Sequence, residues 1–155
     1  GSLTIAGTDD IFIGRDRGTA VITQSGGLVD FNHNTFIGNG NNANANTSGT
    51  YNLSAGVLNV KREFVIGREG DNATHTGILN VTGGTITKTG DEKMIVGQNK
   101  AKGTVVQSGG AISVNNELSI GNGVPQQAQS TSILANASPR RPICLILSFR
   151  EPWLN

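Results

Sequence analysis

The chain has 155 residues, enough for one domain with one buried core, and its 12 Lys and Arg nearly balance its 11 Asp and Glu. This balance, without a basic cluster, argues against a nucleic-acid partner, and the single cysteine excludes an internal disulfide framework and a cysteine-based zinc site. No apolar run reaches the roughly 18 residues expected of a membrane span. The 22 glycines, with many Asn and Thr residues, instead favour short strands joined by tight turns.

Two short motifs recur in a fixed order along the chain. The first is an aliphatic residue followed by glycine, and its glycines lie 24 to 30 residues apart: Gly14, Gly38, Gly67, Gly97 and Gly121. The second is Ser-Gly-Gly or a near variant, which occurs at 25–27, 54–56, 82–84 and 108–110. Two markers that keep the same phase four times indicate an internal repeat.

Each repeat contains short segments in which apolar residues alternate with polar ones, the pattern of strands with one buried face. In chain order these segments are centred at 11–13, 29–31, 35–37, 51–53, 58–60, 64–66, 79–81, 94–96, 105–107, 112–114 and 118–120. Three strands per repeat match one turn of a parallel β-coil, with coils stacked about 4.8 Å apart. The sequence therefore predicts an all-β fold, a right-handed single-stranded parallel β-helix of four to five coils with three short strands per coil.

The composition changes abruptly near residue 124. All 22 glycines precede this point, whereas all four prolines follow it, and the segment 124–155 carries neither motif. We therefore expect solenoid repeats over 1–123, beginning in mid-repeat, and a non-repeat tail over 124–155. The tail is interpreted either as a cap on the last coil or as foreign sequence read through from a gene cut short.

Two stretches carry a family likeness. Gly49–Val60, followed by Phe64–Gly67, and the later stretch Thr104–Gly123 resemble the autotransporter-associated β-strand repeat, and the likeness extends over 4–123. The resemblance implies a solenoid, an origin in a longer bacterial protein and an extracellular or cell-surface location. It implies no catalytic residues, because the family shares none.

One pair of side chains suggests acid–base chemistry. His33 and Asp9 occupy the same position in successive repeats, so His33 is a candidate general base with Asp9 as its orienting carboxylate. The alternative is an exposed ladder of alternating charges between stacked coils, with no catalytic role.

The turn that follows the first motif is a candidate calcium site. The longest insertions, 39–49 and 68–77, fall at this turn, and loops on one edge of a solenoid often form its binding edge. Asp16, Glu69 and Asp71 bring carboxylates to this corner, and clustered oxygen ligands suit Ca²⁺. The spacing matches neither an EF-hand nor the nonapeptide Gly-Gly-x-Gly-x-Asp calcium repeat, and solvated turns explain the same residues.

The strands that end at the first motif are apolar on both faces. We expect four residues to form an outward apolar stripe, a candidate surface for an acyl chain, a partner or self-association: Phe12, Phe36, Val65 and Ile95. Alternatively, the apolar run 143–147 of the tail lies across this stripe.

Two functions of different classes remain open. The first is a structural or adhesive segment without chemistry of its own. The second is a hydrolase, calcium-assisted or not, acting on a small ester or lactone such as an acyl-homoserine lactone, or on a polysaccharide. Parallel β-helices often host carbohydrate-active sites, which is an analogy from fold alone. The change in composition near residue 124 also supports a hydrolase, because a truncated reading frame joined to foreign sequence is typical of a clone recovered from environmental DNA by an activity screen. Whether the chain is an enzyme is left undecided by the sequence.

Overall fold

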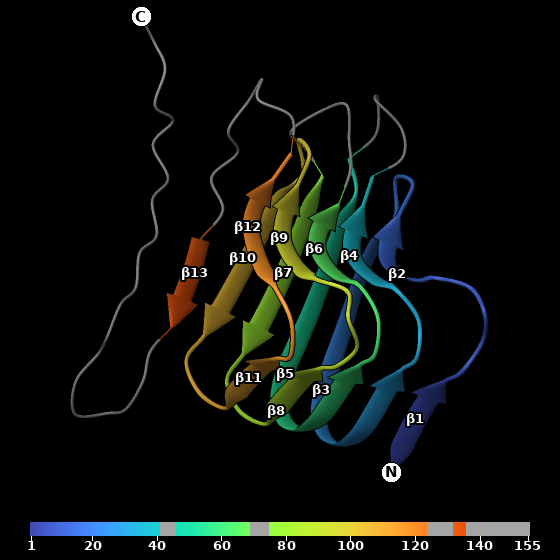
Figure 1. Cartoon of the computed structure of the whole chain (residues 1–155), viewed down its shortest axis with the longest axis vertical. Coiled ribbons are helices and arrows are strands. Elements are labelled where there is room, and N and C mark those ends of the chain that lie inside the picture. The colour runs from blue at the N-terminus through green and yellow to red at the C-terminus, as the bar shows by residue number, and fades with distance from the viewer. Residues whose placement is uncertain (41–45, 69–74, 124–131, 136–155) are drawn as a thin grey trace, which may run out of the picture.

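The computed structural model describes residues 1–40, 46–68, 75–123 and 132–135. In these residues the secondary structure is entirely strands and turns, and the strands stack side by side in a β-solenoid of about four turns (Figure 1). Every strand pair is parallel. The predicted parallel β-solenoid is therefore confirmed.

The strands form two hydrogen-bonded sheets. The larger sheet contains β1 (Ser2–Ile5), β3 (Thr19–Phe31), β5 (Ser48–Val60), β7 (Thr76–Val81), β8 (Thr85–Lys88), β10 (Lys102–Gln107), β11 (Ala111–Val114) and β13 (Ser132–Ala135). The smaller sheet contains β2 (Ile11–Arg15), β4 (Thr35–Asn39), β6 (Phe64–Arg68), β9 (Met94–Gln98) and β12 (Leu118–Asn122).

Each coil has three sides, because the long strands β3 and β5 change direction at the Ser-Gly-Gly motif. The register of β3 with β5 shifts between Gln24 and Leu28, so the two halves of each strand lie on different sides of the coil. We call the side formed by 19–24, 48–53, β7, β10 and β13 the first side. The second side contains β1, 28–31, 57–60, β8 and β11, and the smaller sheet is the third side.

Inward side chains stack in columns along the solenoid axis. On the third side, Ile13 pairs with Ile37, which pairs with Ile66 and then with Val96. These four side chains are almost completely buried, as are Leu53 and Leu58 of the other two sides. They belong to one continuous core that runs the length of the stack, as the alternation of apolar residues predicts.

The backbone conformation and close packing explain why the first motif ends in glycine. At Gly38 the backbone has a φ of 71°, and an added Cβ would lie 2.0 Å from the carbonyl oxygen of Thr76. On the opposing strand, a Cβ added to Gly77 would lie 2.1 Å from the carbonyl oxygen of Ile37. Two columns of glycine therefore pack backbone against backbone where the third and first sides meet. We call this contact the glycine seam; its members are Gly14, Gly38, Gly67 and Gly97 on the third side and Gly49, Gly77 and Gly103 on the first.

One strand lies in the segment expected to be a non-repeat tail. β13 pairs in parallel with β10, Ser132 opposite Thr104, and extends the first side by one row. The remaining residues of 124–155, including the run 143–147, lie outside the described residues. The predicted boundary between 123 and 124 stays a prediction.

Candidate functional site

The predicted base and carboxylate lie at the corner between the second and third sides. Asp9 is exposed and His33 is half-buried. Their neighbours Asn34 and Asp10 are joined by a hydrogen bond, in which Nδ2 of Asn34 donates to Oδ1 of Asp10 over 2.9 Å. In the described structure, no hydrogen bond or ion pair joins His33 to Asp9. The corner thus holds both residues without the contact that an oriented base requires, and their catalytic role stays a prediction.

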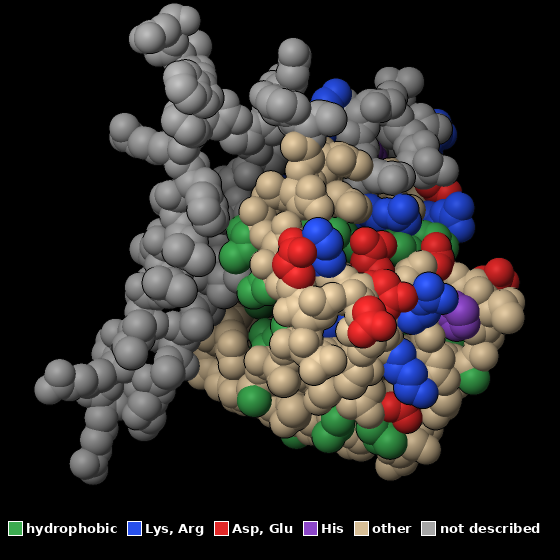
Figure 2. Space-filling model, in the orientation of Figure 1, with side chains coloured by type: hydrophobic (Ala, Val, Ile, Leu, Met, Phe, Trp, Pro, Cys, Tyr) green, Lys and Arg blue, Asp and Glu red, His purple; other side chains and the backbone are tan. Residues whose placement is uncertain are grey.

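The same corner carries charged pairs between coils. Nε of Arg62 lies 2.9 Å from Glu92, and Nζ of Lys93 lies 2.9 Å from Glu117. Figure 2 shows acidic and basic side chains intermixed on this face. A hydrogen bond from its own backbone, together with the Arg62 guanidinium, holds the pKa of Glu92 below its usual value. Exposed pairs of this kind add little stability.

The predicted calcium ligands are only partly visible. Asp16 is exposed, its backbone has a φ of 46°, and its Oδ2 lies 3.0 Å from Nε of Arg15. Glu69 and Asp71 lie outside the described residues. Among the residues that are described, no three His, Cys, Asp or Glu side chains are grouped so that they could hold a metal ion. The calcium site therefore remains a prediction.

The outward apolar stripe exists, but the expectation that it is exposed is wrong. Phe36, Val65 and Ile95 pack into one cluster with exposed fractions of 1%, 0% and 2%, and Phe12 is half-buried beside them. The rings of Phe12 and Phe36 stack with their centroids 5.4 Å apart.

Arginines that follow the marker glycines help to cover this stripe. The guanidinium of Arg68 lies 4.1 Å from the ring centroid of Phe36, and that of Arg15 lies 4.3 Å from the ring centroid of Phe12. Such cation–π contacts also bury the aliphatic stems of the arginines against the rings. Binding of an acyl chain or partner to the stripe stays a prediction, and it would require these side chains to move.

A buried histidine lies at the corner that carries the insertions. His75 is fully buried, and neither ring nitrogen has a hydrogen-bond partner among the described residues. Its imidazole packs on the backbone of Gly40, where an added Cβ would lie 2.2 Å from Cγ of His75. In the part of the chain that the structure describes, Oδ1 of Asn39 and Oε1 of Gln98 are also buried without a partner. Unpaired buried polar atoms are uncommon in proteins, so a small polar ligand or a water molecule at this corner would gain hydrogen bonds.

The sequence pattern does not single out His75, because it lies within a stretch interpreted as an exposed insertion. The position of His75 within the repeat could have indicated its burial. His75 directly precedes a first-side strand, as do Thr47 and Ala101, and all three residues are buried.

A lysine faces the core on the second side. Lys88 pairs with Val60 and Val114 in register, is fully buried, and donates a hydrogen bond from Nζ to the carbonyl oxygen of Thr89. Burial lowers the pKa of its amine, against the opposing effect of nearby carboxylates, the largest from Glu92. The sequence carried a signal here too, since a lysine occupies a repeat position that is apolar in other coils. Because no part of the residue is exposed, its amine cannot meet a substrate without a structural change.

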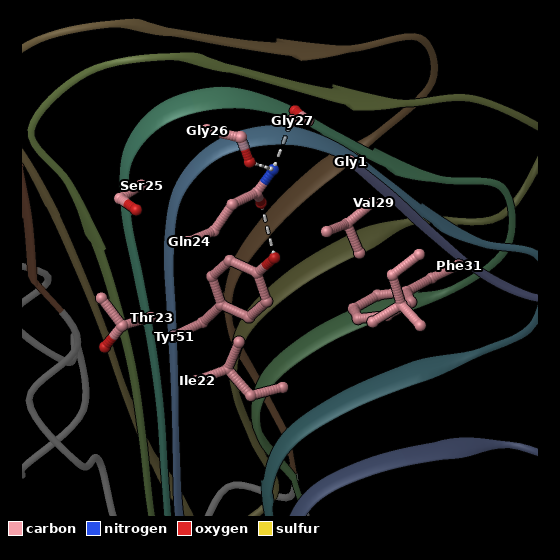
Figure 3. A pocket seen from close by; sticks show the side chains of 11 residues that line it. Gly1, Ile22, Thr23, Gln24, Ser25, Gly26, Gly27, Val29, Phe31 and Tyr51 are labelled. Carbon is pink, nitrogen blue, oxygen red and sulfur yellow. Dashed lines mark hydrogen bonds between the residues drawn. The ribbon is translucent and has the colours of Figure 1, made fainter.

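A hollow of about 470 Å³ opens at the N-terminal end of the solenoid. In Figure 3 the side chains of Ile22, Val29, Phe31 and Tyr51 point into the space enclosed by the coils. Two polar side chains in this hollow, Gln24 and Tyr51, are paired. Oε1 of Gln24 accepts a 2.7 Å hydrogen bond from the Tyr51 hydroxyl, and its Nε2 donates to the Val57 carbonyl over 3.0 Å. Burial raises the pKa of Tyr51 to about 12, so its hydroxyl stays protonated at neutral pH.

Comparisons with protein-family models, with curated proteins and with solved structures found no match to this chain. The resemblance to the autotransporter-associated repeat, and the extracellular location it implies, therefore remain expectations. Within the described part of the chain, no helix is long and apolar enough to cross a membrane.

Proposed function

We propose that the chain is a repeat segment of a secreted or surface-displayed bacterial protein and that its role is structural or adhesive. The observation that carries this proposal is the use of outward polar side chains to join one coil to the next. Nδ2 of Asn80 donates to Oδ1 of Asn52 over 2.8 Å, and Nδ2 of Asn59 donates to Oδ1 of Asp30 over 2.7 Å. Side chains paired in this way stiffen the stack and are not available for chemistry.

A stack of this kind suits a scaffold. Each coil contacts only its neighbours, and successive coils have similar sequences. The solenoid therefore presents the same kinds of polar groups at regular intervals along its surface. An adhesive protein gains from such a surface, because many weak identical contacts add up to firm attachment. The resemblance of 4–123 to repeats of surface-displayed proteins supports the same role.

A hydrolase acting on a small ester, a lactone or a polysaccharide is the second candidate. The observation that favours it is the imidazole of His75, which lies at the corner that carries the insertions and has no hydrogen-bond partner among the described residues. An imidazole without a hydrogen-bond partner is able to act as a base or as a metal ligand once a substrate or ion reaches it.

Hydrolysis assays separate the two candidates. The panel contains an acyl-homoserine lactone, a p-nitrophenyl ester and soluble polysaccharides, each with and without EDTA. We expect no turnover from the wild-type chain. Turnover that EDTA abolishes and Ca²⁺ restores, or that is lost in His75→Ala or His33→Ala while folding is retained, would replace the structural proposal with the hydrolase.

Adhesion is tested on cells that display the chain on their surface. We expect these cells to attach to one another or to coated surfaces more strongly than cells displaying Ile66→Asp, in which the solenoid is disrupted. Equal attachment by the two kinds of cell would remove the adhesive role and leave only a spacer.

A further inference from the structure

The two ends of the described solenoid are uneven in a complementary way. At the N-terminal end, β1 and β2 form the first rows of the second and third sides, whereas the first side begins one row later with 19–24 of β3. At the other end, β13 adds one row to the first side, while β11 and β12 end the second and third sides. β1 and β13 lie at opposite ends of the stack (Figure 1). In the described solenoid, the first side is therefore one row short at the N-terminal end and one row longer, by β13, at the other end.

We propose that this chain associates head to tail with a second copy of itself through these stepped ends. In this joint, β13 of one copy pairs with the outer edge of β3 in the next, and β11 and β12 of the first copy stack on β1 and β2 of the second. Strand direction is preserved, because every strand pair that the structure describes is parallel and the copies share one axis. A contact between different surfaces that does not close on itself produces open-ended filaments.

Backbone groups at the edge of β3 are free to make this contact. Successive residues of a parallel strand direct their N–H and C=O groups to opposite neighbours. The carbonyl of Gly18 accepts a 3.1 Å hydrogen bond from the N–H of Ser48 in β5. By alternation, Thr19, Val21 and Thr23 direct their backbone groups away from β5, towards an edge that no described strand covers. An uncovered edge of this kind is a template for a further strand.

The apolar side chains at the two ends match when the register of the chain is continued across the joint. Leu118 of one copy then meets Ile11 of the next, and Ile120 meets Ile13. Leu118 has an exposed fraction of 45% in the single chain.

The second side matches in the same way. Ile112 of one copy meets Leu3 of the next, and Val114 meets Ile5. Leu3 has an exposed fraction of 52%, and it also lines the hollow at the N-terminal end, which the second copy covers. Stacking thus removes apolar surface from water at both ends, which is the driving force for the association.

Two features make the joint weaker than the contact between coils of one chain. The first is steric. A Cβ added at Gly49 would lie 2.0 Å from the carbonyl oxygen of Ile13, and Ala20 is the equivalent of Gly49 one coil earlier. In the joint, the Cβ of Ala20 therefore approaches the carbonyl oxygen of Ile120 in the other copy.

The second feature is electrostatic. Continuing the register places Glu117 of one copy next to Asp10 of the other, and like charges on neighbouring strands repel. The association should accordingly be reversible, and it should tighten several-fold in Ala20→Gly and at higher salt, which screens the repulsion.

Sedimentation velocity of the 155-residue chain over a concentration series tests the proposal. We expect the average sedimentation coefficient to rise with concentration beyond that of a dimer, without a plateau. A coefficient that stays at the monomer value, or that levels off at a closed dimer, would overturn the head-to-tail joint.

Variants that block one end each make the test specific. Val21→Pro removes an outward-facing N–H at the edge of β3, and Leu118→Lys places a charge on the other end. Each variant alone should be monomeric, but an equimolar mixture should form dimers and nothing larger, because one intact end of each kind remains. Val21→Thr and Leu118→Met, which keep the N–H and the apolar contact, should assemble like the wild type.

The proline variant is checked for folding by circular dichroism. If it does not fold, Leu3→Lys blocks the same end without altering the backbone and takes its place in the mixture. A mixture that stays monomeric while both variants are folded contradicts the proposal, as does weaker association of Ala20→Gly.

Discussion

Replacing Gly77 by alanine should destabilise the solenoid, although the substitution adds a single methyl group. The new Cβ would lie 2.1 Å from the carbonyl oxygen of Ile37 and 2.2 Å from the backbone nitrogen of Gly67. Both neighbours are backbone atoms, and no side-chain rotation can relieve the overlap. Restoring an ordinary contact of 3.4 Å requires the seam to open by about 1.3 Å, the difference between 3.4 and 2.1 Å.

The expected cost follows from two opposing effects. Overpacking of a well-packed site costs about 1–3 kcal/mol, and the rigid neighbours on both sides place Gly77 near the upper end. Alanine also restricts the unfolded chain, which returns about 0.4–1 kcal/mol. The net loss is about 2 kcal/mol, equivalent to a decrease of about 4–8 °C in the melting temperature.

Ala20 provides a matched control, because it occupies the same column at the end of the stack. Ala20→Gly removes a Cβ at a position where no described third-side strand lies beyond β2. The free energy of unfolding should therefore decrease by only about 0.4–1 kcal/mol. Both variants are measured by urea unfolding with circular dichroism, at a concentration low enough to keep the chain monomeric. A Gly77→Ala chain as stable as the wild type would refute the explanation given for the glycine seam.

Four further substitutions probe the core. Lys88→Met should stabilise the chain by roughly 1 kcal/mol at neutral pH, because it removes a buried amine from an apolar column. Tyr51→Phe should cost about 1–2 kcal/mol, since it leaves Oε1 of the buried Gln24 without its 2.7 Å hydrogen bond. Ile66→Asp should abolish folding, as should Leu58→Asp, because each places an unpaired charge in a fully buried position.

The urea concentration at the midpoint of unfolding measures the stability of Lys88→Met and Tyr51→Phe. The dependence of this midpoint on pH tests whether the Lys88 amine and the Tyr51 hydroxyl cause the change. The pKa of Lys88 in the folded chain lies below 10.5, so the unfolded chain binds the proton more tightly and wild-type stability rises as the pH approaches 10.5. The pKa of Tyr51 is raised from 10.0 to about 12, so its contribution is present below pH 10 and is lost as the pH rises towards 12. Each variant should lack the corresponding change; a variant that kept it would assign the effect to another group.

Circular dichroism checks the aspartate substitutions, with Val21→Asp as the control. Val21 is 62% exposed, so an aspartate there remains in water and the chain should fold. Loss of strand signal in Val21→Asp would show that added charge, and not burial, causes the unfolding.

The sequence by itself determined the repeat, most of the strand positions and most of the inward residues, although the predicted segments do not include β1, β8, β13 or residues 19–24 of β3. Ile13, Ile37 and Ile66 recur at one phase of the repeat, and alternation is a local property that survives in any parallel stack. The recurring motifs of the sequence also indicated where glycines are needed. Only the structure shows that Gly38 and Gly77 face each other across the glycine seam. That contact joins residues distant in the chain, so no local pattern contains it.

Tertiary structure alone decided what happens to the side chains that break the pattern. Alternation correctly placed Phe36 on the outer face, yet Arg68, one coil further along, folds over its ring and helps to bury it. His75 is buried against Gly40 although its stretch is polar. Burial and pairing depend on what a neighbouring coil places above each residue, and a spacing along the chain does not specify this. The predicted sites were therefore proposed from residue type, whereas their exposure and partners followed only from the stacking of the coils.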